Sequence, residues 1–137
     1  MQTFDIETYI QEKLEAKKVE YATKYNSDRA DRLLHTYRYD LEDLRNHYNQ
    51  KMESLQSKLD SAIKNNQDTC VIKSNGHRVD KMSKWGFVSN AALNNFLLML
   101  SQKGYEYGVT SENRELTMCG GEKDTVVDKC ITIDMKR

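Results

Sequence analysis

Proline, a long apolar run and an excess of either charge are all missing from this sequence, and each absence narrows what the chain can be. The lack of proline is compatible with long helices and tight glycine turns. The longest apolar run, Phe96 to Leu100, is far shorter than the roughly 18 residues that span a bilayer. Basic and acidic residues number 21 each, so no net field draws the chain to nucleic acid or to an anionic membrane. We expect no membrane partner, and any nucleic-acid binding has to come from a local patch.

Cysteine is also scarce. Cys70, Cys119 and Cys130 cannot all pair with one another, and none belongs to a Cys-x-x-Cys unit, which favours a reducing compartment. Together with His77 they nominally offer four zinc ligands, but structural zinc usually takes paired ligands two to four residues apart. We therefore expect no metal site and interpret the cysteines as small buried hydrophobic residues.

The composition is that of a chain that folds. Apolar residues make up 38% and charged residues 31% of its 137 residues, which fits one domain, or one small domain with a helical extension. Near the N-terminus, Asp5, Glu7 and Glu12 lie where a signal peptide carries basic and then apolar residues. Together with the cysteines, these features predict a soluble, cytoplasmic protein.

Catalytic constellations are missing as well. There is no Gly-x-Ser-x-Gly elbow, and His35 and His47 are separated along a helical stretch. No two carboxylates stand out as an acid–base pair, and Gly120-Gly121 has neither the spacing nor the following helix of a phosphate loop. We expect a protein that is not an enzyme and that has no catalytic residues and no bound cofactor.

The stretch from Asp28 to Asn66 has the longest helical period, and its apolar residues recur at steps of three and four. The stripe they form consists of Leu34, Tyr37, Leu41, Leu44, Tyr48, Met52, Leu55, Leu59 and Ile63. Such a helix is about 55 to 60 Å long, longer than a domain of this size is wide. We expect the stripe to be too long for the chain to cover, and we interpret its part from Tyr37 to Ile63 as an interface.

A shorter helix precedes this stretch, capped by Thr3 or Asp5, and Asn26-Ser27-Asp28 offers residues that favour caps and turns. A turn there, with Ser27 or Asp28 as the second cap, folds the two helices into a hairpin. The alternative is one unbroken helix, which demands a partner chain. The predicted organisation is a helical hairpin or extended arm over 1–66 and a small α+β domain over 67–137.

The second part changes to a period of two. Asn75-Gly76 is the strongest short hairpin signal, because both turn residues need positive φ. It predicts a hairpin of two strands, Thr69–Lys73 and His77–Met82, with Ile72 facing Val79.

An apolar helix and further strands follow. The helix is predicted to start at Ser89 or Asn90 and to end with Gly104 as its C′ residue. The strands are Tyr105–Thr110, Arg114–Cys119 and Thr125–Met135, with turns at Ser111-Glu112-Asn113 and at Gly120-Gly121. In the last strand one face carries Val127, Ile131, Ile133 and Met135. The order β-β-α-β-β-β predicts an α+β fold in which one helix covers an antiparallel sheet.

A basic stretch within this part is the candidate contact site: Lys73, His77, Arg78, Lys81, Lys84 and Trp85. In the predicted hairpin Lys73 faces Arg78, and like charges so placed are destabilising by some tenths of a kcal/mol. A phosphate backbone or an acidic protein surface would offset this repulsion, and Trp85 would stack on a base or fill a partner pocket. The alternative is that Asp80 neutralises the pair and Trp85 closes the core.

These features lead to three hypotheses. The leading one is a non-enzymatic binding protein that occupies a surface of a larger protein or nucleoprotein complex. The second is a nucleic-acid-binding protein that uses Lys73 to Trp85, and the third is a structural homo-oligomer, such as a homodimer, built on the long helix. In its build the chain resembles small phage-encoded inhibitors of bacterial defence, such as anti-CRISPR proteins. That resemblance implies a defence complex, such as a CRISPR effector, as the partner and the host cytoplasm as the location.

Overall fold

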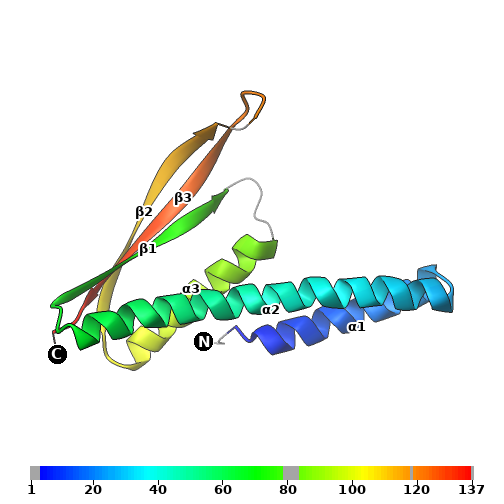
Figure 1. Cartoon of the computed structure of the whole chain (residues 1–137), viewed down its shortest axis with the longest axis horizontal. Coiled ribbons are helices and arrows are strands. Elements are labelled where there is room, and N and C mark those ends of the chain that lie inside the picture. The colour runs from blue at the N-terminus through cyan, green and yellow to red at the C-terminus, as the bar shows by residue number, and fades with distance from the viewer. Residues whose placement is uncertain (1–3, 79–83, 118, 137) are drawn as a thin grey trace.

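The computed structural model describes residues 4–78, 84–117 and 119–136. A long helical layer runs across the molecule, and a sheet rises from one end of it (Figure 1). The elements in chain order are α1 (Ile6–Lys24), α2 (Ser27–Lys64), β1 (Thr69–Arg78), α3 (Lys84–Gln102), β2 (Glu106–Thr117) and β3 (Lys123–Asp134). The predicted α+β class is confirmed. Within the described ranges, no helix combines the length and the apolar character that crossing a membrane requires.

Helices α1 and α2 form the predicted hairpin, with α1 lying along the N-terminal half of α2 (Figure 1). Asn26, one residue before the predicted cap, caps α2, because its side-chain oxygen accepts a hydrogen bond of 2.9 Å from the backbone N–H of Arg29. At the other end of α1, Arg45 donates to both carboxylate oxygens of Glu7, over 2.7 and 2.8 Å. The two helices therefore fold back on each other, and the unbroken-helix alternative is wrong.

The hairpin predicted around Asn75-Gly76 is not formed. Strand β1 runs through these residues and pairs antiparallel with β3. The register shifts between Ser74 and His77, so Asn75-Gly76 lies in a bulge, a position that glycine also suits. In the continuous strand the residues on both sides of Asn75-Gly76 pair with β3, and Ile72 lies opposite Ile131, both fully buried in the core. Long-range burial thus outweighs the local turn signal.

Strand β2 likewise continues through Ser111-Glu112-Asn113, where the sequence predicted a turn. All 12 of its residues pair with β3 in an unbroken register, so more backbone groups are satisfied than in two short hairpins. The predicted β-β-α-β-β-β order is therefore corrected to β-α-β-β, with the sheet order β1-β3-β2. The turn at Gly120-Gly121 is where the sequence predicted it, with φ values of 97° and 83°.

Helix α3 begins at Lys84, before the predicted cap at Ser89-Asn90. The added turn contains Val88, which is fully buried in a cluster with Leu41 of α2. Tertiary packing therefore overrides the preference of serine and asparagine for caps. The end of the helix agrees with the prediction, because Gly104 follows it with a φ of 83°.

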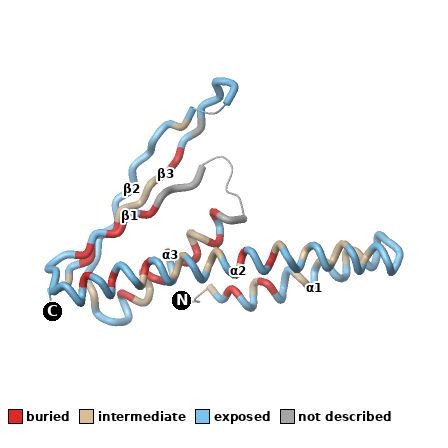
Figure 2. The backbone as a smooth tube through the Cα atoms, viewed as in Figure 1, coloured by how far each residue is buried: buried red, intermediate tan, exposed pale blue. Residues whose placement is uncertain are grey.

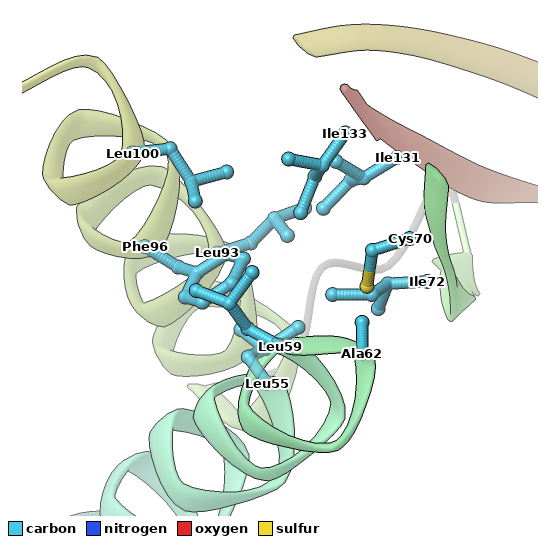
Figure 3. Packing of buried hydrophobic residues seen from close by; sticks show 10 residues of the cluster. All are labelled: Leu55, Leu59, Ala62, Cys70, Ile72, Leu93, Phe96, Leu100, Ile131 and Ile133. Carbon is cyan, nitrogen blue, oxygen red and sulfur yellow. The ribbon is translucent and has the colours of Figure 1, made fainter. Parts of the chain in front are cut away.

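Two hydrophobic clusters lie along α2, one after the other. The larger one fills the space between the C-terminal half of α2, helix α3 and the sheet (Figure 3). Its buried members are Leu55, Leu59, Ala62, Cys70, Ile72, Leu93, Phe96, Leu100, Ile131 and Ile133. The smaller one joins the start of α1, the middle of α2 and the start of α3 through Ile6, Ile10, Leu41, Leu44 and Val88.

These clusters cover most of the long apolar stripe of α2. Leu41, Leu44, Leu55 and Leu59 are buried, Tyr37, Tyr48 and Met52 are half-buried, and Ile63 is 48% exposed. The prediction that the chain cannot cover this stripe is wrong, because α1, α3 and the sheet cover successive parts of one helix (Figure 2). Most of the stripe is therefore core and not a free docking surface.

The cysteines report on this packing. Burial raises the pKa of the Cys70 thiol, which keeps it protonated and unreactive, whereas Cys119 is exposed. We expect iodoacetamide at neutral pH to label Cys119 at least about tenfold faster than Cys70 in the folded protein. Peptide mass spectrometry measures both rates. After unfolding in urea the rates should converge, and equal rates in the folded protein would contradict the packing of β1 on α2.

Candidate functional site

The basic stretch predicted from the sequence is divided between two elements. Lys73 lies in β1, where its side chain is exposed. His77 and Arg78 end β1, Lys84 and Trp85 begin α3, and Lys81 lies in the segment 79–83, outside the described residues. The side chains of His77, Arg78, Lys84 and Trp85 are also outside the described part of the chain. The described members of the stretch thus belong to two different elements, the end of β1 and the start of α3.

The predicted cross-strand pair of Lys73 and Arg78, whose repulsion made this stretch a candidate, is not formed. Lys73 pairs with Cys130 across the sheet, and Arg78 pairs with Val126. The like charges therefore do not face each other, and no ligand is needed to offset them. The alternative role of Asp80 concerns a residue outside the described ranges.

The three cysteines do not converge on a metal site. Cys70 is buried between the sheet and α2, with its thiol 3.7 Å from the carbonyl oxygen of Lys58. Cys130 lies on the opposite face of the sheet, and Cys119 is exposed next to the β2–β3 turn. Among the described residues, no three histidine, cysteine or acidic side chains are grouped to hold a metal ion.

A different cationic cluster lies where α2, α3, β1 and β3 meet. Three side-chain contacts define it: Lys51 Nζ donates to Ser74 Oγ at 2.8 Å, Lys129 Nζ donates to Asn90 Oδ1 at 3.2 Å, and His47 Nε2 lies 2.7 Å from Ser89 Oγ. We call these six residues the basic ring.

The backbone links each contact of the basic ring to the next. Ser74 and Lys129 are directly opposite each other in the β1–β3 register, which brings their Cβ atoms to roughly 5 Å. Ser89 and Asn90 are neighbours in α3, and His47 and Lys51 are one turn apart on α2. Ser74 is buried and the other five residues are half-buried. The six residues of the ring therefore come from four elements and are all buried or half-buried.

The charged side chains of the basic ring are all cationic. Among the described residues, neither Lys51 nor Lys129 forms an ion pair with a carboxylate. Asp128 precedes Lys129 but lies on the opposite face of the sheet, where Arg114 donates to it over 2.7 Å. Burial lowers the pKa of Lys51, and the neighbouring charge of Lys58 lowers it further. The ring therefore holds positive charge with no internal neutralisation.

The second candidate surface is the outer part of the α1–α2 hairpin, residues 11–40, which we call the distal hairpin. None of these residues is buried (Figure 2). Val19 and Tyr39 are 67% and 65% exposed, although both are large and apolar or aromatic. The distal hairpin is therefore a pair of helices without a core of its own.

A groove of about 310 Å³ opens along the distal hairpin, between its two helices. Its lining is mainly apolar or aromatic, with polar residues among it: Lys18, Tyr21, Ala22, Tyr25, Ser27, Ala30, Asp31 and Leu34. We call this the distal groove. Its size is at the lower end of the range for ligand pockets, which suits one or two side chains of a partner.

No family model, curated protein or solved structure matches this chain.

The two helices of the distal hairpin contact each other through half-buried and exposed side chains. At its inner end, Leu14 and Tyr37 are partly buried against the smaller cluster. Lys17 Nζ lies 5.6 Å from the ring centre of Tyr37 across the hairpin and 2.9 Å from a carboxylate oxygen of Glu20 in its own helix. Such solvent-exposed ion pairs and cation–π contacts stabilise helices only weakly.

Sequence reasoning missed the basic ring, although one signal was present. Lys129 occupies an inward position in the alternating pattern of β3, between Val127 and Ile131. A lysine at an inward-facing position of a strand indicates a buried or recessed charge. Lys51 gives no such signal, because it lies beside the apolar stripe and looks like a solvated residue.

Proposed function

We propose that this chain is a non-enzymatic binding protein that covers a surface of a larger protein or nucleoprotein partner, and that the distal hairpin makes the contact. The observation that supports the proposal is the absence of any buried residue from 11 to 40. Helices of globular proteins owe most of their stability to the packing of an apolar face. A partner that packs on the distal hairpin supplies that missing layer.

The distal groove supports a protein as the partner. Tyr21, Tyr25 and Leu34 present apolar surface, while Lys18 and Asp31 carry both signs of charge. This combination matches the apolar centre and polar rim of protein interfaces, in which a few anchor side chains fill pockets and contribute most of the affinity. The expected partner inserts an aromatic or aliphatic side chain between the two helices.

The narrower form of this proposal is a small phage-type inhibitor that obstructs a defence complex such as a CRISPR effector. Its support is the likeness of build to anti-CRISPR proteins together with the exposed distal hairpin. Coexpression with a panel of CRISPR effectors in a plasmid-interference assay tests it. Restored plasmid survival with one effector supports the narrower form, and unchanged interference with every effector leaves only the general proposal.

Filling the distal groove is expected to abolish partner binding. In Ala22→Arg, the long side chain occupies the space that an anchor side chain needs, so the affinity should fall at least about tenfold. Thr23→Arg is the matched control, because Thr23 is exposed on the same helix and does not line the groove. The partner is first captured from the native host and identified by mass spectrometry, and its affinity for each variant is then measured by calorimetry.

A trimmed chain provides a second test. Replacing residues 18–34 with a short glycine–serine turn removes no buried residue, so the trimmed protein should keep its unfolding midpoint. It should no longer bind the partner. If the trimmed chain or Ala22→Arg binds as tightly as the parent chain, the distal hairpin is not the contact surface.

Nucleic-acid binding is a second candidate, favoured by the exposed side chain of Lys73 and by the position of the other basic residues at the end of β1 and the start of α3. Binding of DNA or RNA that falls steeply with salt and is lost in Lys73→Glu with Arg78→Glu supports it. If no oligonucleotide binds at low salt, this candidate is excluded. Light scattering at several concentrations tests the homo-oligomer, which a monomer throughout would exclude.

A further inference from the structure

Within the described part of the chain, the basic ring has more hydrogen-bond donors than its own oxygens engage. The oxygens of Ser74 and Asn90 each accept a hydrogen bond from a lysine, and His47 and Ser89 are paired with each other. Each lysine ammonium has three N–H groups and uses one of them in the ring. Two N–H groups therefore remain on Lys51 and two on Lys129, together with the Ser74 hydroxyl proton and the Asn90 amide protons.

These unused donors belong to cationic groups, so a negatively charged acceptor suits them best. A half-buried ammonium is costly when no carboxylate neutralises it, and burial already lowers the pKa of Lys51. The carboxylate that precedes Lys129, Asp128, is bound by Arg114 on the other face of the sheet. The protein therefore holds two half-buried lysines in an environment that favours an incoming anion.

We propose that the basic ring is a binding site for a single phosphate group, either inorganic phosphate or the terminal phosphate of a small phosphomonoester. A phosphate has several acceptor oxygens and carries up to two negative charges, which match two ammonium groups flanked by a hydroxyl and an amide. The site comes from α2, α3, β1 and β3 and does not include the distal hairpin, so it is independent of the proposed partner contact.

The partial burial of the ring favours a small ligand over a nucleic acid. A nucleic-acid backbone is bound by a row or patch of exposed cations that follows several phosphates. In the basic ring Ser74 is buried and the two lysines are half-buried, so the site offers two partly covered cations and no exposed row of them. Nucleic-acid binding at this site is an alternative outcome of the test.

The test is a titration of the full chain with phosphate, in which NMR records the amide chemical shifts. The ionic strength is held constant, with chloride as the reference anion. We expect saturable shifts at Ser74, Asn90 and Lys129 with inorganic phosphate and with a mononucleotide. If the mononucleotide binds more tightly, the source is a phosphomonoester, and similar affinities indicate free phosphate. Lys51→Met and Lys129→Met should each weaken binding at least about tenfold, because each removes a charged donor.

Two matched variants separate specific binding from a general charge effect. Lys64→Met removes an exposed lysine of the same helix, about 20 Å from Lys51 along the helix axis, and should leave the affinity within about twofold. Lys51→Arg keeps the charge and should retain more of the affinity than Lys51→Met. The proposal is overturned if no saturable shift occurs or if Lys64→Met weakens binding as much as Lys51→Met. It is also overturned if an oligonucleotide without terminal phosphate binds the ring more tightly than the mononucleotide.

Discussion

Replacing Phe96 with alanine is expected to lower the free energy of unfolding by about 3 to 5 kcal/mol, the largest effect of any single truncation proposed for this chain. The Phe96 ring is fully buried, and it points from α3 into the space between α2 and the sheet (Figure 3). Its removal leaves a cavity that neither neighbouring element can fill without moving. Urea denaturation followed by circular dichroism measures the loss.

Phe87→Ala is the matched control, because it makes the same chemical change on the same helix. The Phe87 side chain is 41% exposed and contacts Phe4 and Tyr9 through ring centroids 5.8 and 5.5 Å away. Its truncation should cost about 1 kcal/mol, the value typical of an aromatic contact at the surface. Equal losses for Phe87→Ala and Phe96→Ala would contradict the position of α3 against the sheet.

Leu59→Ala is expected to cost about 2 to 5 kcal/mol, whereas Ile63→Ala, one turn further along α2, should cost about 1 kcal/mol or less. Leu59 is 1% exposed within the larger cluster, and Ile63 is 48% exposed at the helix end. The same denaturation experiment compares the two variants. Similar small losses would mean that the C-terminal half of α2 is not covered by the sheet and α3.

Much of the fold follows from local features of the sequence. The cap-forming residues at Asn26-Ser27-Asp28 favour a break between the two helices, which is confirmed, whereas the period alone left one unbroken helix as the alternative. The glycines at Gly104 and Gly120-Gly121 mark the end of α3 and the β2–β3 turn, where positive φ is required. These features depend on neighbours in the sequence, so the sequence is sufficient to find them.

The errors occur where long-range packing decides. Asn75-Gly76 has the local chemistry of a turn but lies in a bulge, because pairing with β3 buries Ile72 against Ile131. The length of α2 suggested an apolar stripe too long for the chain to cover, but α1, α3 and the sheet each cover a part of it. Neither the strand order nor the crossing of α3 over α2 can be derived from a periodicity.

The candidate site shows the same division. The predicted basic stretch is contiguous in sequence, and its described residues belong to two elements, β1 and α3. The basic ring depends on Lys51 and Lys129, which come together only because β1 lies between β3 and α2. Only the inward position of Lys129 in its strand was visible beforehand.

The central claim is that the C-terminal half of α2 belongs to a packed core, whereas its N-terminal part has no buried residue and is proposed to bind a partner. Native-state hydrogen exchange of the isolated chain, followed by mass spectrometry or NMR, tests this directly. We predict that amides between residues 14 and 38 exchange at least about a hundredfold faster than those between 50 and 62, because only the latter lie over buried side chains. Equal protection along the whole of α2 would contradict the claim.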